Sequence, residues 1–232
     1  MNEPKILTLL QRDVLVVFFE EYPESQVFFL TGGSALAEFY LQHRYSDDLD
    51  VFTTIPEALR QVDPILRDIA TRLNLRIRQS RRVANFAQYF LEGDAYPGSI
   101  LKIDWVRDIN VQFGEKVKRG SVIVDSLIDI ATNKICAILG RTEIKDFVDL
   151  YILLKEGYFA FNDIFTMAKE KDLGLTEFYF AGMLRDVEKI KMLPRMVRPV
   201  MLQEVQDFFI ALSDSMLDRL NPLMQGENNA GV

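Results

Sequence analysis

Residues 31–52 have the sequence TGGSALAEFYLQHRYSDDLDVF, and they carry the strongest signal in the chain for both fold and chemistry. The apolar run at residues 26–31, which leads into this stretch, predicts a buried strand that enters a tight turn at two glycines. Residues 34–44 follow with apolar side chains at helical spacing. Residues 48–53 then alternate like a second strand. The predicted order is therefore strand, glycine turn, helix, strand.

The glycine turn is a candidate phosphate site. Gly33 and Ser34 stand between the predicted strand and the predicted helix. Glycine lets the backbone approach a ligand closely, and the free N–H groups at the start of a helix bind phosphate. We therefore expect these two residues to contact the phosphates of a nucleotide.

Two carboxylates follow on the second strand. Because strand side chains alternate, Asp48 and Asp50 point to one face, while Leu49 and Val51 point to the core. Two like charges on one face repel each other, and a divalent cation removes that repulsion. Asp47 would point the other way. The spacing therefore predicts a metal site at Asp48 and Asp50.

A third carboxylate lies on a separate strand, in the sequence SILKIDWV at residues 99–106. Alternation places Lys102 and Asp104 on one face and three apolar residues on the other. Asp104 would hold a second metal or polarise an attacking hydroxyl. Lys102 would stabilise phosphate charge or orient Asp104.

The rest of the chain predicts an α/β (α+β) fold with a mixed sheet, followed by a helical domain. Further strands are expected at 75–79, 83–91 and 100–106, and a helix at 57–73 that Pro64 bends. Later helices are expected at 126–139, 143–155, 161–171, 176–191 and 199–218. We expect an α/β domain at 1–115, a helical domain at 116–222 and a flexible tail at 223–232.

Composition excludes several classes of protein. No segment approaches the roughly 20 apolar residues that span a bilayer, and the N-terminus lacks the pattern of a secretory signal. The single cysteine, Cys136, excludes an internal disulfide, so a cytoplasmic protein is expected. The single histidine, His43, argues against a zinc hydrolase built on histidines.

Charge is unevenly distributed along a chain whose net charge is −7. Residues 1–57 contain three Lys or Arg and ten Asp or Glu, whereas residues 60–82 contain seven Arg and two Asp. An acidic site beside a basic strip suits metal-assisted phosphate chemistry. The strip at residues 72–82 could hold an RNA backbone. It consists of Arg72, Arg76, Arg78, Arg81 and Arg82.

Taken together, these motifs resemble the nucleotidyltransferase superfamily, and most closely the AbiEii/AbiGii group of abortive-infection toxins. The group typically carries a GG-S/T-x-L helix, an Arg-x-Ser before the acidic pair, a Lys-x-Asp strand, and a later Lys, Arg and Asp-rich helix. The matching residues here are 32–36, 44–46, 102–104, Lys134, Arg141 and 145–151. The resemblance covers residues 27–155.

The resemblance implies specific roles. Gly33 and Ser34 would hold the triphosphate, and Asp48, Asp50 and Asp104 would bind Mg2+. Lys134 would reach the phosphates, and Asp146 is a further polar position of the nucleotide site. The implied reaction moves a nucleoside monophosphate from a nucleoside triphosphate to an acceptor hydroxyl.

The resemblance also implies an RNA acceptor, such as tRNA, an antitoxin protein as partner, and no membrane. Two alternatives remain open from the residues alone. One is a small-molecule nucleotidyltransferase of the antibiotic-modifying type, which the acidic N-terminal part fits. The other is a nucleotide-binding relative without turnover, which the complete set of three carboxylates argues against.

Overall fold

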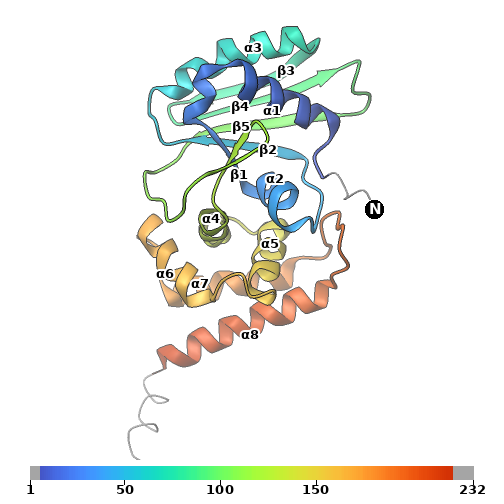
Figure 1. Ribbon diagram of the computed structural model, residues 1–232. Coiled ribbons are helices and arrows are strands. Elements are labelled where there is room, and N and C mark those ends of the chain that lie inside the picture. The colour runs from blue at the N-terminus through green and yellow to red at the C-terminus, as the bar shows by residue number, and fades with distance from the viewer. Residues whose placement is uncertain (1–5, 222–232) are drawn as a thin grey trace, which may run out of the picture. The chain divides into compact units, whose positions relative to one another are not determined.

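The computed structural model describes residues 6–221, and the chain divides into two compact units, Met1–Ile130 and Ala131–Val232 (Figure 1). The first unit contains a mixed sheet with helices, and the second is helical, which confirms the predicted fold class. Within the described range, no helix has the length and apolar character needed to cross a bilayer. The predicted tail at 223–232 lies outside the described residues.

The first unit is organised around a seven-stranded sheet, counted over residues 6–221, with the order β3-β4-β5-β2-β1-β7-β6. Its strands are β1 (Phe29–Thr31), β2 (Asp48–Thr53), β3 (Leu75–Val83), β4 (Phe86–Gly93), β5 (Ile100–Arg107), β6 (Val117–Arg119) and β7 (Val122–Val124). β2 pairs in parallel with β5, and β1 with β7, while the other neighbours are antiparallel. The acidic strand β2 therefore lies in the middle of the sheet.

One face of this sheet is covered by α1 (Leu9–Glu21) and α3 (Val62–Arg72), as Figure 1 shows. Phe18 of α1 packs edge-on against Trp105 of β5, with ring centroids 4.8 Å apart. Strand residues that point to these helices are buried, and their neighbours in sequence are half-buried or exposed. This alternation confirms the predicted faces of β2 and β5, and it leaves the acidic residues on the opposite face.

The helix expected at 34–44 begins two residues earlier, at the glycines themselves, and ends three residues earlier. It consists of α2 (Gly32–Leu36) and one π-helical segment, η2 (Ala37–Leu41), and it ends at Gln42, whose φ is +49°. The predicted helix at 57–73 is likewise divided into the 3-10 helix η3 (Ala58–Gln61) and α3. Pro64 lies in the first turn of α3. N–H groups in the first turn have no acceptor within the helix, so proline, which lacks an N–H, costs no hydrogen bond there.

The sequence did not predict α1, β6 or β7. The two strands form a short hairpin at the edge of the sheet, within the stretch assigned to the helical part. Each has three residues, too few for a visible alternation. They extend the sheet past residue 115, and the first compact unit ends at Ile130.

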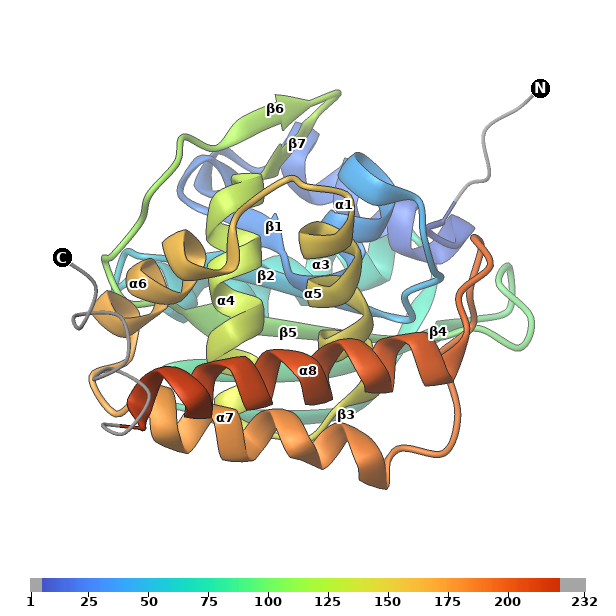
Figure 2. The same cartoon turned by 90° about the horizontal axis from the view of Figure 1, so that it is seen from below.

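The second unit consists of helices close to the predicted ones. They are α4 (Leu127–Gly140), which begins in the first unit, α5 (Ile144–Lys155), α6 (Phe161–Lys171), α7 (Glu177–Leu184), the 3-10 helix η4 (Arg185–Lys189) and α8 (Leu202–Leu220). Figure 2 shows α7 running beside α8. Phe147 of α5 packs edge-on against Phe209 of α8, with ring centroids 5.1 Å apart.

Candidate active site

The junction of β1 and α2, which we call the glycine turn, brings Gly32 and Gly33, the first two residues of α2, against other residues of the site. Gly32 has a φ of +68°, in the left-handed region that favours glycine, and a Cβ on it would lie 2.3 Å from Oδ2 of Asp50. A Cβ on Gly33 would lie 2.4 Å from Nη2 of Arg44, a residue only 2% exposed. The turn therefore excludes larger side chains because a carboxylate and a guanidinium fill the space.

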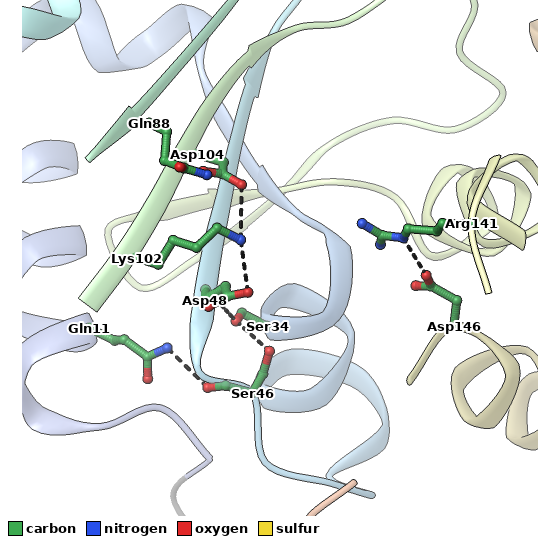
Figure 3. Close-up of polar contacts among 9 residues, drawn as sticks. All are labelled: Gln11, Ser34, Ser46, Asp48, Gln88, Lys102, Asp104, Arg141 and Asp146. Carbon is green, nitrogen blue, oxygen red and sulfur yellow. Dashed lines mark hydrogen bonds and ion pairs between the residues drawn. The ribbon is translucent and has the colours of Figure 1, made fainter. Parts of the chain in front are cut away.

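Ser34 fixes the chain that leads into β2. Its buried hydroxyl donates to the backbone carbonyl of Asp48 and lies 2.9 Å from the hydroxyl of Ser46 (Figure 3). The carbonyl of Ser46 in turn accepts a hydrogen bond of 3.0 Å from Nε2 of Gln11. In this arrangement the Ser34 side chain holds the backbone at Asp48 in place. The predicted contact of Ser34 with phosphate stays a prediction.

The register of β2 and β5 brings the predicted carboxylates together. Asp48 pairs with Lys102, and Asp50 pairs with Asp104, so all four residues lie on one face of the sheet. We call this the acidic face. The side chains of Asp48 and Asp104 are 28% and 13% exposed, which keeps both partly open to a ligand. The structure therefore assembles the set of residues that the sequence singled out on two separate strands.

Lys102 lies between two of these carboxylates. Its Nζ is 3.0 Å from Oδ2 of Asp48 and 3.2 Å from Oδ2 of Asp104 (Figure 3). Burial lowers the pKa of Lys102, but the hydrogen bond and charge of Asp48 and the charge of Asp104 outweigh it. The net pKa of Lys102 therefore lies above its usual value, and the ammonium stays charged at neutral pH.

Gln88 is a site residue that the sequence analysis missed. Its Nε2 donates a hydrogen bond of 2.8 Å to Oδ1 of Asp104, its direct partner in the antiparallel pairing of β4 with β5. The alternation of β4 places Gln88 on the polar face. Which residue of β5 it meets depends on register, which the sequence does not show.

The acidic face suits a hard cation by the chemistry of its donors, which are carboxylate oxygens. Lys102 already supplies one positive charge to two of them. Among residues 6–221, no group of three or more His, Cys, Asp or Glu side chains is arranged to hold a metal ion by itself. His43, the single histidine, is fully buried.

The remaining predicted residues form a buried cluster in the second unit. Nζ of Lys134 lies 2.8 Å from Oδ1 of Asp146 and 2.8 Å from Oδ2 of Asp149, and both aspartates are 0% exposed. Nε of Arg141 lies 2.8 Å from the other oxygen of Asp146 (Figure 3). Burial raises the pKa of Asp146, but the charge of Lys134 and the bond from Arg141 lower it below its usual value. A contact of this cluster with nucleotide stays a prediction.

Comparison with protein families gives one decisive match. The model of the nucleotidyl transferase AbiEii toxin of type IV toxin–antitoxin systems matches residues 13–219, almost the whole chain. The chain belongs to the AbiEii family. An AbiEii toxin is a nucleotidyltransferase, so membership implies a nucleoside triphosphate substrate and a cognate antitoxin. A search of curated proteins found no match.

Solved structures share the AbiEii fold at low sequence identity. A Helicobacter pylori protein assigned as a nucleotidyltransferase aligns with a TM-score of 0.59 and 18% identity, over 92% of this chain and 94% of its own. JHP933 from Helicobacter pylori aligns with a TM-score of 0.56 and 18% identity, over 94% of both chains. The nucleotidyltransferase toxin MenT4 from Mycobacterium tuberculosis aligns with a TM-score of 0.54 and 12% identity, over 94% of this chain and 84% of its own. At these identities the alignments show a common fold.

Proposed function

We propose that this AbiEii-family chain transfers a nucleoside monophosphate from a nucleoside triphosphate to a hydroxyl of RNA, such as a tRNA, with Mg2+ held at the acidic face. The observation that carries the proposal is the pairing of Asp50 with Asp104 across β2 and β5, next to the pairing of Asp48 with Lys102. This pairing gathers three carboxylates and one ammonium from two strands onto a single partly exposed face.

Asp48, Asp50 and Asp104 are the residues that would hold Mg2+. Magnesium in nucleotide sites is usually bound by one or two carboxylates together with phosphate oxygens of the substrate. Bound Mg2+ would neutralise phosphate charge and stabilise the charge that develops at the transferred phosphate.

The protein residues would orient the two reactants. The backbone at Gly33 and Ser34 would contact the triphosphate, next to Gly32, whose missing side chain lets its backbone lie close to Asp50. Asp104 would orient the acceptor hydroxyl and take its proton, because Gln88 and Lys102 hold both of its oxygens in place. The acceptor oxygen then bonds to the α-phosphorus as the bond to pyrophosphate breaks.

The proposal is tested by incubating the purified protein with each labelled nucleoside triphosphate, Mg2+ and total tRNA. Wild type is expected to label RNA, while Asp48→Ala and Asp50→Ala are expected to lose labelling. Asp47→Ala is the matched control, because Asp47 is exposed and precedes the strand. Full labelling by Asp50→Ala would contradict the proposed site. Nucleotide binding that depends on Mg2+, without any label in RNA, would instead favour the alternative acceptor class.

A further inference from the structure

A line of paired residues runs from the acidic carboxylates to the edge of the sheet. Asp50 pairs with Asp104, Asp104 pairs with Gln88, and Gln88 pairs with Arg81 on β3. Direct partners on neighbouring strands place their side chains on the same face. Arg81 therefore lies on the acidic face, and β3 is the edge strand of the sheet.

A β-bulge decides that Arg81, rather than Arg82, has this position. The pairing of β3 with β4 shifts between Ile77 and Gln79. Arg76 pairs with Glu92, which lies on the same face of β4 as Gln88. In a regular strand every second side chain shares a face, so without the register shift Arg82 would lie on the acidic face with Arg76. With it, Arg82 pairs with Ala87, whose buried side chain points to the helix-covered face. Consistent with this, Nη2 of Arg82 donates a hydrogen bond of 3.0 Å to the carbonyl of Leu59 in η3.

Two other arginines of β3, Arg76 and Arg78, are compensated by carboxylates. Arg76 lies 3.0 Å from Asp94 and 3.8 Å from Glu92, and Arg78 lies 3.5 Å from Glu92. Arg81 is exposed, and its partner on β4 is the neutral Gln88. Among the residues that the structure describes, no carboxylate forms an ion pair with Arg81. Its charge is therefore available to an anion from outside the chain.

Arg81 lies on the side of the site where we place the acceptor hydroxyl, near Asp104 and away from the glycine turn. Two strand spacings separate the backbone of Arg81 from that of Asp104, about 10 Å. The glycine turn, where we place the triphosphate, lies beyond Asp50 at the other end of the same line. A guanidinium has a planar fork of donors that fits a phosphate group. An edge strand also leaves room for a polymer to continue past the sheet.

We propose that Arg81 binds a backbone phosphate of the acceptor polynucleotide, close to the nucleotide whose hydroxyl is positioned at Asp104. This proposal rests on the proposed function, and it identifies the acceptor as a nucleic acid strand that crosses β4 and β3. Gln88 lies between Arg81 and Asp104, because it pairs with Arg81 on β3 and with Asp104 on β5.

The test measures binding of labelled total tRNA to the full chain over a series of KCl concentrations, without nucleotide. Arg81→Gln is expected to weaken binding about 5- to 10-fold at low salt. It is also expected to reduce the slope of log K against log salt by about one unit, the value for one lost phosphate contact. Arg81→Lys should keep the slope because it keeps the charge. Arg82→Gln, its neighbour on the opposite face, should behave like wild type.

Two further readouts separate the possible failures. Thermal melting and binding of a fluorescent nucleoside triphosphate should be unchanged in Arg81→Gln, since Arg81 lies away from the glycine turn. If wild type labels RNA while Arg81→Gln binds tRNA with wild-type affinity and slope, this proposal is overturned and the proposed function stands. If wild type does not bind tRNA, the proposal is also overturned. The labelling assay with other acceptors then decides separately whether the chain transfers nucleotides.

Discussion

Gly32 and Asp50 are in such close contact that a single added carbon would displace the carboxylate. A Cβ on Gly32 would lie 2.3 Å from Oδ2 and 3.2 Å from Cβ of Asp50, and the φ of +68° adds backbone strain to any substitution. Asp50 is at the centre of the acidic face, so a change in the glycine turn acts directly on the proposed metal site.

For Gly32→Ala we therefore expect at least a 100-fold loss of nucleotidyl transfer. Backbone strain alone should lower the free energy of unfolding by about 1–2 kcal/mol. Gly98→Ala is a matched control, because Gly98 also has a positive φ, +75°, but has open space around its Cβ position. Gly98→Ala should lower the free energy of unfolding measured in urea by a similar amount, and it should keep wild-type transfer activity. Equal activity of the two variants would show that Asp50 does not depend on the turn.

Substitution of Lys102 should separate metal binding from catalysis. Its ammonium compensates Asp48 and Asp104, so Lys102→Met leaves these carboxylates to an added cation. We expect tighter binding of Mn2+ in calorimetric titration and a loss of transfer of about 100-fold, typical of removing one group that stabilises developing charge. Lys118→Met, on the exposed edge strand β6, serves as control. Unchanged or weaker Mn2+ binding in Lys102→Met would argue against a cation site between these carboxylates.

Ser34→Ala distinguishes a positioning role from a phosphate-binding role. The buried hydroxyl donates to the carbonyl of Asp48, and its loss removes this partner from a carbonyl that is partly buried. We expect the free energy of unfolding to fall by about 1–3 kcal/mol. The turnover rate should fall, while KM for the nucleoside triphosphate should change little. A raised KM with unchanged stability would instead assign the hydroxyl to the triphosphate.

The buried cluster in the second unit predicts a pH dependence of stability. The pKa of Asp146 is lowered in the folded chain, because the effects of Lys134 and Arg141 exceed that of burial. A lowered folded pKa stabilises the protein above the unfolded value, about 4, and this stabilisation is lost as pH falls through the folded pKa. The contribution of Asp146 should therefore be constant from pH 5 to 7 and decline below about pH 4.

For Asp146→Asn we expect the free energy of unfolding at pH 7 to fall by about 3–5 kcal/mol, the range for breaking a buried ion pair. The further loss of stability in acid should be smaller than in wild type. Urea unfolding at pH 7, 5 and 3.5 measures both effects. Asp163→Asn changes an exposed aspartate of α6 and should leave both quantities as in wild type. A variant as stable as wild type at pH 7 would show that the cluster does not stabilise the fold.

Strand and helix patterns in the sequence were enough to predict which residues face the core and which carboxylates share a polar face. Alternation assigned Asp48, Asp50, Lys102 and Asp104 to polar faces, because side chains in a strand point to opposite sides in turn. In the same way, apolar residues at helical spacing predicted most of the helices of the second unit. These patterns are local, so they are visible before any strand is paired.

Which of these residues come into contact depends on how the strands pair, and local patterns do not show that. The pairing of β2 with β5 joins strands that are about 50 residues apart in sequence, and it sets Asp50 beside Asp104. The contact of Gln88 with Asp104 depends on register, and the place of Arg81 depends on a bulge in β3. Register and bulges arise from packing between distant segments, and one residue of shift moves every side chain of a strand to the other face.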